Sequence, residues 1–215
     1  MFPLIENRLR SIYQILFAHF GHRRWWPART PFEVCVGAIL TQNTSWKNVV
    51  KAISNLDEAD RLDALRLYEI REEDLATIIR PAGYYNIKAK RLKNFITHVV
   101  EKHDGSLDKM FLASVDDLRK ELLSINGVGR ETADSMILYA AGKPIFVIDV
   151  YTRRVLRRHG ILGAEADYDE AQSVFHRNIE PDVALYNDFH AQFVAVGSNY
   201  CGTKPKCSGC PLEGM

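Results

Sequence analysis

The sequence predicts an all-α protein, and three observations support this fold class. Apolar residues recur at three- and four-residue steps through most of the chain, which is the period of an amphipathic helix. Proline and glycine residues separate these periodic segments, as helix ends require. The strand-like run Ile145–Ile148 is too short and isolated to found a sheet.

The periodic segments predict about ten helices. The first covers residues 5–20, where Leu9, Ile12 and Leu16 repeat on one face. The others are expected over residues 32–40, 46–56, 62–67, 72–79, 88–100, 115–123, 132–141, 152–158 and 168–178. The 215 residues are 47% hydrophobic and 26% charged, values that exclude disordered and fibrous proteins.

The net charge of +1 does not by itself indicate a polyanionic partner. The basic residues are clustered, however, at Arg23-Arg24, within residues 88–93 and within residues 153–158. Such clusters suit either a phosphate backbone or a solvated helix surface. The longest apolar runs fall short of the roughly 18–20 residues of a membrane helix, and the amino end lacks a signal peptide, so we expect a cytoplasmic protein.

Three of the four cysteines lie close together near the carboxyl end. Cys201, Cys207 and Cys210 are separated by intervals containing proline and glycine, which predicts a loop around one metal centre. Zinc and an iron–sulfur cluster both remain open, and either normally takes a fourth ligand, which this chain does not contain. Cys35 lies in an apolar helix and is expected to be a small buried hydrophobe.

A glycine-containing hairpin is predicted between two helices. The amphipathic segment 117–124 is followed by Ile125-Asn-Gly-Val-Gly-Arg130 and then by a second helix. Gly127 and Gly129 are expected to permit backbone angles closed to other residues and to remove side chains from an approach path. Their N–H groups, at the start of the second helix, would bind a phosphate without reading a base.

Asp149 follows the apolar residues Phe146–Ile148, at the point where the next helix begins. An aspartate at such a position is most often an N-cap. Because this one comes after a phosphate-binding hairpin, we predict a catalytic carboxylate instead.

These motifs together resemble the helix-hairpin-helix base-excision DNA glycosylases of the endonuclease III superfamily. The resemblance rests on residues 125–134 and on Val147-Ile-Asp-Val-Tyr-Thr-Arg-Arg-Val155, and it covers nearly the whole chain. The turn at Leu40–Thr44, the loop Gly83-Tyr-Tyr-Asn86 with the lysines that follow it, and the carboxyl-terminal cysteines also match. The cysteine loop departs from the family's four-cysteine 4Fe–4S pattern by one residue in its first interval and by the missing last cysteine.

The resemblance implies a DNA repair enzyme, a hydrolase that extrudes one nucleotide and cleaves the bond between base and sugar. Asp149 occupies the position of the family's catalytic aspartate. Bifunctional members carry a lysine where this chain has Glu131, and a glutamate cannot form an imine. We therefore expect a monofunctional glycosidase without efficient AP-lyase activity. The resemblance also implies a 4Fe–4S cluster.

The tryptophans look similar to those of the bacterial 3-methyladenine DNA glycosylase III branch. Trp26 and Trp46, with Trp25 beside them, would sandwich a flipped alkylated purine, and electron-rich rings attract a cationic base. The alternative for these rings is core packing. Gln42 and Tyr84 are candidates to fill the gap left by the flipped nucleotide. The alternative roles for these two residues are hydrogen bonding within a loop and packing.

Lys88 fits a phosphate contact, although it could also face solvent. We expect two helical lobes with a cleft between them. A six-helix barrel lobe over residues 31–143 would carry the hairpin, and a split lobe over residues 1–30 and 144–215 would carry Asp149 and the cysteine loop. We expect a monomer that is associated with the nucleoid. Its expected partner is double-stranded DNA containing a damaged base. The rival functions are a mismatch thymine/uracil glycosylase of the same architecture and a non-catalytic DNA clamp.

Overall fold

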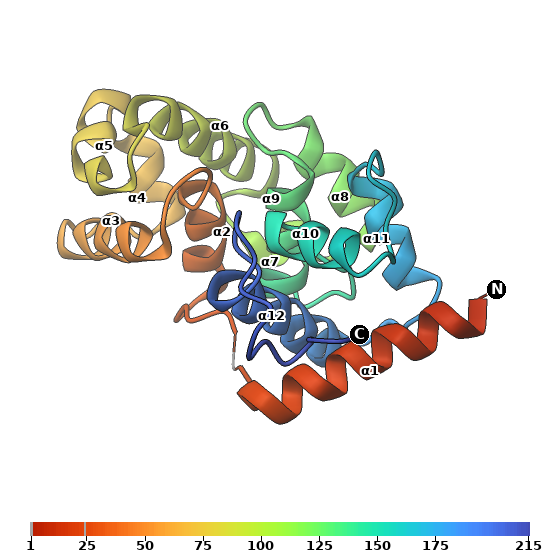
Figure 1. Cartoon of the computed structure of the whole chain (residues 1–215). Helices are drawn as coiled ribbons and strands as arrows, with labels where there is room; N and C mark the ends of the chain where they lie inside the picture. Colours follow the sequence, from red (N-terminus) through yellow and green to blue (C-terminus); the bar gives the residue numbers. More distant parts are fainter. Residues whose placement is uncertain (1, 24) are drawn as a thin grey trace. The chain divides into compact units, whose positions relative to one another are not determined.

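The computed structural model describes residues 2–23 and 25–215, and over these residues it contains twelve α-helices, a 3₁₀ turn, a π-helical turn and no strand (Figure 1). The prediction of an all-α protein is confirmed. None of the described helices is both long enough and apolar enough to cross a membrane. The chain divides into two compact units: unit 1 comprises Met1–Pro27 with Pro144–Met215, and unit 2 comprises Ala28–Lys143.

Unit 2 is built around one buried helix. Its helices are α2 (Pro31–Leu40), α3 (Trp46–Glu58), α4 (Ala64–Glu69), α5 (Glu72–Ile78), α6 (Tyr85–His103), α7 (Leu107–Met110), α8 (Val115–Ser124) and α9 (Arg130–Ser135), with a 3₁₀ turn at Arg80–Ala82 and a π-helical turn at Met136–Ala140. Thr30 caps α2 by accepting a hydrogen bond from the Glu33 backbone N–H, and Pro31 occupies the first turn. Because α2 packs against α3, α6 and α9, all eight residues from Glu33 to Leu40 are buried.

Unit 1 consists of α1 (Phe2–Phe20), α10 (Val150–Arg158), α11 (Tyr168–His176) and α12 (Val183–Asn199). Helix α12 packs against both α1 and α10. Gly197 permits the close contact with α10, because a Cβ at this position would lie 2.5 Å from the Cβ of Tyr151. The rings of Phe146, Phe175 and Phe189 pack together beside these helices.

Helix α12 lies outside the predicted helices, and the reason is its burial. Ten of its residues, from Tyr186 to Gly197, are buried. A helix covered on most sides has no polar face, and therefore lacks the apolar stripe by which an amphipathic helix is found in a sequence. Its start does carry a signal, since Asp182 accepts a hydrogen bond from the Leu185 backbone N–H as an N-cap. The four-residue helix α7 was too short to show a period.

Candidate active site

The predicted hairpin is formed in unit 2 by α8, the loop 125–129 and α9. Gly127 has a φ of +98°, and a Cβ there would lie 2.2 Å from the Arg91 Cγ, so both conformation and space require glycine. Gly129 differs: its φ is −93° and its ψ is 177°, which any residue can adopt, and no neighbouring atom lies within 4 Å of the place a Cβ would take. The expectation of a glycine-only backbone is therefore wrong for Gly129, where the missing side chain only leaves open space.

Gln42 fastens this hairpin through its side-chain amide. Its Nε2 donates hydrogen bonds to the Gly127 carbonyl at 3.1 Å and to the Thr132 Oγ1 at 3.0 Å. Its Oε1 accepts a hydrogen bond from the Arg91 guanidinium at 2.5 Å. Both the nitrogen and the oxygen of the Gln42 amide therefore have hydrogen-bond partners within the protein. Of the two alternatives for Gln42, the structure shows hydrogen bonding within the protein.

Lys88 is not on the surface, and the prediction of a phosphate contact is wrong. Its side chain is only 1% exposed, and Nζ donates hydrogen bonds to the carbonyls of Leu40 and Ala82, both at 2.8 Å. Burial, with a smaller contribution from Arg91, lowers the pKa of Lys88 to about 8. The ammonium group satisfies two carbonyls and joins the end of α2 to the 3₁₀ turn.

Tyr84 is presented at the start of α6. Its side chain is 69% exposed, and its φ is +46°, directly after Gly83 with a φ of +66°. Two successive residues with positive φ make a tight turn that directs this ring outward. The predicted contact of Tyr84 with DNA stays a prediction.

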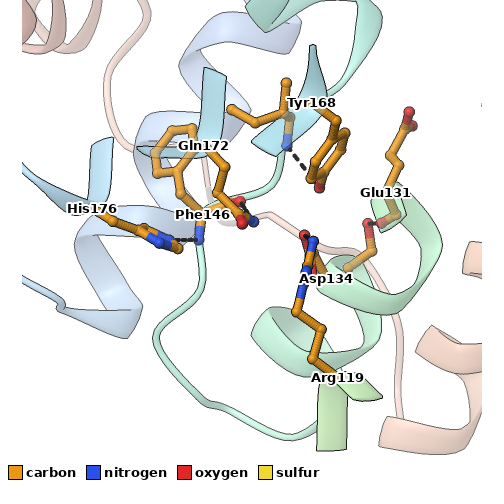
Figure 2. Close-up of polar contacts among 9 residues, drawn as sticks. Arg119, Glu131, Asp134, Phe146, Tyr168, Gln172 and His176 are labelled. Atoms are coloured by element: carbon orange, nitrogen blue, oxygen red, sulfur yellow. Dashed lines mark hydrogen bonds and ion pairs between the residues drawn. The ribbon is translucent and has the colours of Figure 1, made fainter. Parts of the chain in front are cut away.

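A partly buried ion pair joins the two helices of the hairpin (Figure 2). Arg119 on α8 donates a hydrogen bond through Nε to the Asp134 carboxylate on α9 at 2.7 Å, and Asp134 is fully buried. Glu131 is exposed, and its side chain extends away from this ion pair. Asp134 therefore serves the packing of α8 on α9, and Glu131 stands at the surface of the first turn of α9.

In unit 1, the segment before Asp149 is buried and has no regular secondary structure, and side chains of α11 satisfy its backbone (Figure 2). The Phe146 N–H donates to the His176 Nε2 at 3.0 Å, and the Phe146 carbonyl accepts from the Gln172 Nε2 at 2.8 Å. The Ile148 N–H donates to the Tyr168 hydroxyl at 3.3 Å. These side chains replace the neighbouring strand that a sheet would provide, and they hold the segment that carries Asp149.

Asp149 is the N-cap of α10. Its Oδ1 accepts a hydrogen bond from the Thr152 backbone N–H at 2.7 Å, and its Oδ2 lies 3.7 Å from the Nε2 of His190, at ion-pair distance. Asp149 is 9% exposed and His190 on α12 is 4% exposed. Burial by itself would raise the pKa of Asp149, but His190 and the bonds to Thr152 outweigh it and lower that pKa below its ordinary value.

Asp149 is therefore an N-cap, which was the alternative to a catalytic role. The capping hydrogen bond uses only one of its two carboxylate oxygens. The contribution of His190 was missed from the sequence. This histidine lies on α12, which has no amphipathic signal, and the spacing of 41 residues between Asp149 and His190 carries no local pattern.

The three tryptophans are half-buried rather than fully enclosed in a core. In unit 1 the rings of Trp25 and Trp26 have centroids 6.1 Å apart and planes inclined by 63°. Trp46 is the first residue of α3 in unit 2. Each ring thus keeps part of its surface accessible, and the predicted base pocket stays a prediction.

The cysteine loop encloses a cavity of about 110 Å³ that is lined by Cys201, Cys207 and Cys210. Arg158 on α10 holds the loop by donating hydrogen bonds to the Cys201 Sγ at 3.2 Å and to the Gly202 carbonyl at 2.7 Å. Cys201, Cys207 and Cys210 thus line one cavity, and thiolates are the ligands by which proteins hold iron–sulfur clusters. Cys35 is 1% exposed in α2, as expected of a buried hydrophobe.

Comparison with known proteins identifies the family. Residues 36–181 match the family model for the HhH-GPD superfamily base excision DNA repair protein. A candidate DNA repair glycosylase of Methanocaldococcus jannaschii is 48% identical over 213 residues, which are 97% of this chain and 96% of that protein. A thymine/uracil-DNA glycosylase of Pyrobaculum aerophilum is 29% identical over 91% of this chain and 84% of its own length.

Two solved structures agree with this assignment. A 3-methyladenine DNA glycosylase of H. pylori bound to 1,N6-ethenoadenine is 28% identical with a TM-score of 0.77, over 90% of this chain and 97% of that chain. A trapped endonuclease III–DNA covalent intermediate has a TM-score of 0.83 at 24% identity, over 96% of this chain and 93% of that chain, and shows likeness of fold. The chain therefore belongs to the HhH-GPD superfamily of base excision DNA repair proteins, the DNA glycosylases related to endonuclease III.

Proposed function

We propose that this chain hydrolyses the N-glycosidic bond of a flipped-out alkylated purine, such as 3-methyladenine, in double-stranded DNA and leaves an abasic site. The observation that carries the proposal is the setting of Asp149. One carboxylate oxygen is fixed by the cap of α10, the other lies beside His190, and the lowered pKa keeps the group anionic at neutral pH.

An anionic, immobilised carboxylate suits the chemistry of this bond. Cleavage of a glycosidic bond passes through an oxocarbenium-like state in which the sugar becomes positively charged. A fixed negative charge stabilises that state without any cost of reorganisation at the moment of reaction. The Oδ2 of Asp149 is the atom that we assign to this role, and it can also orient the attacking water.

The choice of an alkylated purine rests on the tryptophans. 3-Methyladenine carries a positive charge, so the faces of aromatic rings attract it, and its charge also makes it a good leaving group. Trp26 and Trp46, with Trp25, are the rings that we assign to the base, and each is half-buried. The similarity to the H. pylori 3-methyladenine DNA glycosylase supports the same substrate class.

A mismatched thymine or uracil is the second candidate substrate, and the relative from Pyrobaculum aerophilum favours it. A neutral pyrimidine is a poorer leaving group and requires hydrogen bonds to its edge. A protein specific for it would need amide groups that bind the edge of the base, in addition to any stacking on aromatic rings.

We propose that the enzyme lacks efficient AP-lyase activity. Glu131, at the position of the family's lyase lysine, has no amine with which to form a Schiff base. Lys88 cannot replace it, because its Nζ is buried and held by two carbonyls. Abasic DNA that is nicked and trapped by borohydride would contradict this assignment.

The hairpin supplies the DNA contact in this proposal. The open space over Gly129 would let a phosphate approach the N–H groups at the start of α9. Gln42 acts indirectly, by holding the Gly127 carbonyl. Exposed Tyr84 is the side chain assigned to the gap left by the flipped nucleotide. We propose that one chain acts on the duplex as a monomer.

We further propose that Cys201, Cys207 and Cys210 hold a 4Fe–4S cluster, which would fasten the carboxyl-terminal loop to α10 when bound. The shared cavity and the hydrogen bonds of Arg158 to the loop support this assignment. Iron and sulfide analysis of anaerobically purified protein tests it, and a colourless protein without either element would refute it.

A panel of duplexes with single lesions tests the function. Each duplex carries 3-methyladenine, 1,N6-ethenoadenine, a mismatched thymine or a uracil, and is incubated with and without subsequent alkali. We expect strand breaks at the alkylated purines, only after alkali treatment. Activity on the pyrimidine lesions alone would favour the second candidate, and no activity on any lesion would favour a DNA clamp.

A further inference from the structure

Three potential metal ligands converge in unit 2, away from the hairpin loop. His98 and His103 lie on α6 and Glu121 lies on α8. The Nε2 atoms of His98 and His103 lie 2.7 Å and 2.6 Å from the same oxygen of Glu121, Oε1. Among the residues that the structure describes, this is the one group of three such side chains whose ligand atoms all lie within 4.8 Å of one another.

The backbone places the two histidines on either side of the glutamate. Five residues of an α-helix turn through about 500°, so the two side chains leave α6 about 140° apart. Their rings are inclined by 43° with centroids 6.0 Å apart, and the Oε1 of Glu121 on α8 lies within hydrogen-bond distance of both rings. The three side chains are 12%, 18% and 22% exposed, so the point where they meet is partly shielded but accessible to a small ion.

We propose that His98, His103 and Glu121 bind one Zn²⁺ ion, with solvent as the fourth ligand. Two imidazoles and one carboxylate are a set that zinc accepts, whereas Mg²⁺ and Ca²⁺ prefer oxygen ligands alone. Imidazoles bind a metal in the neutral form, so a ligand set of two imidazoles and one carboxylate carries one negative charge, which a dication reverses. Zinc bonds of about 2.0–2.2 Å in a tetrahedral arrangement require the nitrogen and oxygen ligand atoms to separate by roughly 0.7 Å from their present distances.

The position of this site gives the ion a structural role. Helix α8 leads directly into the hairpin loop, and α6 contributes Arg91 and Asn94, which hold that loop through Gln42 and the Asn126 carbonyl. An ion that links α6 to α8 would therefore brace the hairpin from its far end. Its binding does not depend on the proposed substrate or on Asp149.

Metal binding is tested on the whole chain after removal of bound metal by a chelator. Zinc at a hundredfold excess over its Kd is expected to raise the Tm by roughly 5–10 °C. Co²⁺ distinguishes this site from the cysteine loop, because cobalt bound by nitrogen and oxygen ligands lacks the intense thiolate charge-transfer absorption. We expect bound Co²⁺ to show visible d–d bands and no intense thiolate charge-transfer absorption.

His98→Gln and His103→Gln are the informative variants, because a glutamine amide still donates a hydrogen bond to Glu121 but is a poor zinc ligand. Each is expected to weaken zinc binding at least about tenfold and to abolish the rise in Tm. His19→Gln, an exposed histidine on α1, is the matched control and should retain both. An unchanged response in His98→Gln and His103→Gln, or no thiolate-free cobalt signal in the wild type, would overturn the proposal and leave a hydrogen-bonded network.

Discussion

Alanine substitutions at the two hairpin glycines should have different consequences. At Gly127 an alanine must adopt a φ of +98° and place its Cβ 2.2 Å from the Arg91 Cγ. The backbone conformation costs about 1–2 kcal/mol, and the displacement of Arg91 adds about 1–3 kcal/mol. We therefore expect Gly127→Ala to lose about 3 kcal/mol of stability, which lowers the Tm by about 6–12 °C.

At Gly129 the backbone is extended and the space for a Cβ is open. Gly129→Ala should change stability by less than about 0.5 kcal/mol, and it should weaken DNA binding because the new methyl group covers the approach to the amides. The assays are thermal unfolding followed by circular dichroism and the affinity for an abasic duplex at fixed salt. Equal losses of stability in the two variants, or unchanged affinity in Gly129→Ala, would refute the reasoning.

The other predictions concern the carboxylate, its histidine, the buried lysine and one tryptophan. Asp149→Asn keeps an N-cap residue, so it should fold normally and lose excision by at least about 100-fold; a near-normal rate would remove Asp149 from the mechanism. His190 lowers the pKa of Asp149, so this group contributes stability that is lost as the pH falls through its depressed pKa. His190→Asn should raise that pKa and move the acid limb of the pH–rate profile upward, and an unmoved limb would contradict this. Lys88→Met leaves two buried carbonyls without a donor, so it should lower the free energy of unfolding by about 2–4 kcal/mol, measured by denaturant unfolding. If the variant lost only DNA affinity and no stability, Lys88 would be a phosphate contact after all. Trp46→Ala should slow excision of 3-methyladenine, and an unchanged rate would assign this ring to packing alone.

Helix positions followed from the sequence wherever a helix has one polar face. The segments of α3 and α8 alternate between buried and exposed positions at helical spacing, so their period was visible. Helix α12 has buried residues on most sides, so it showed no period and was missed. The predicted position of the hairpin was correct because glycine and the apolar residues around it are local signals.

Side-chain roles were harder to predict because they depend on partners distant in the sequence. Lys88 lies in a segment that looks basic and exposed, yet the carbonyls of Leu40 and Ala82 meet its ammonium group in the interior. Gln42 is engaged by Gly127, which lies 85 residues further along the chain. A local sequence pattern does not relate Gln42 to Gly127 or Lys88 to Leu40.

The sequence by itself determined the all-α class, the hairpin and the aspartate at the start of a helix, because helical period, glycine spacing and capping are properties of neighbouring residues. Only the tertiary structure decided that Asp149 faces His190, that Lys88 is buried, and that His98, His103 and Glu121 meet at one point. The physical reason is that burial, pKa and metal coordination are set by groups that packing brings together across helices.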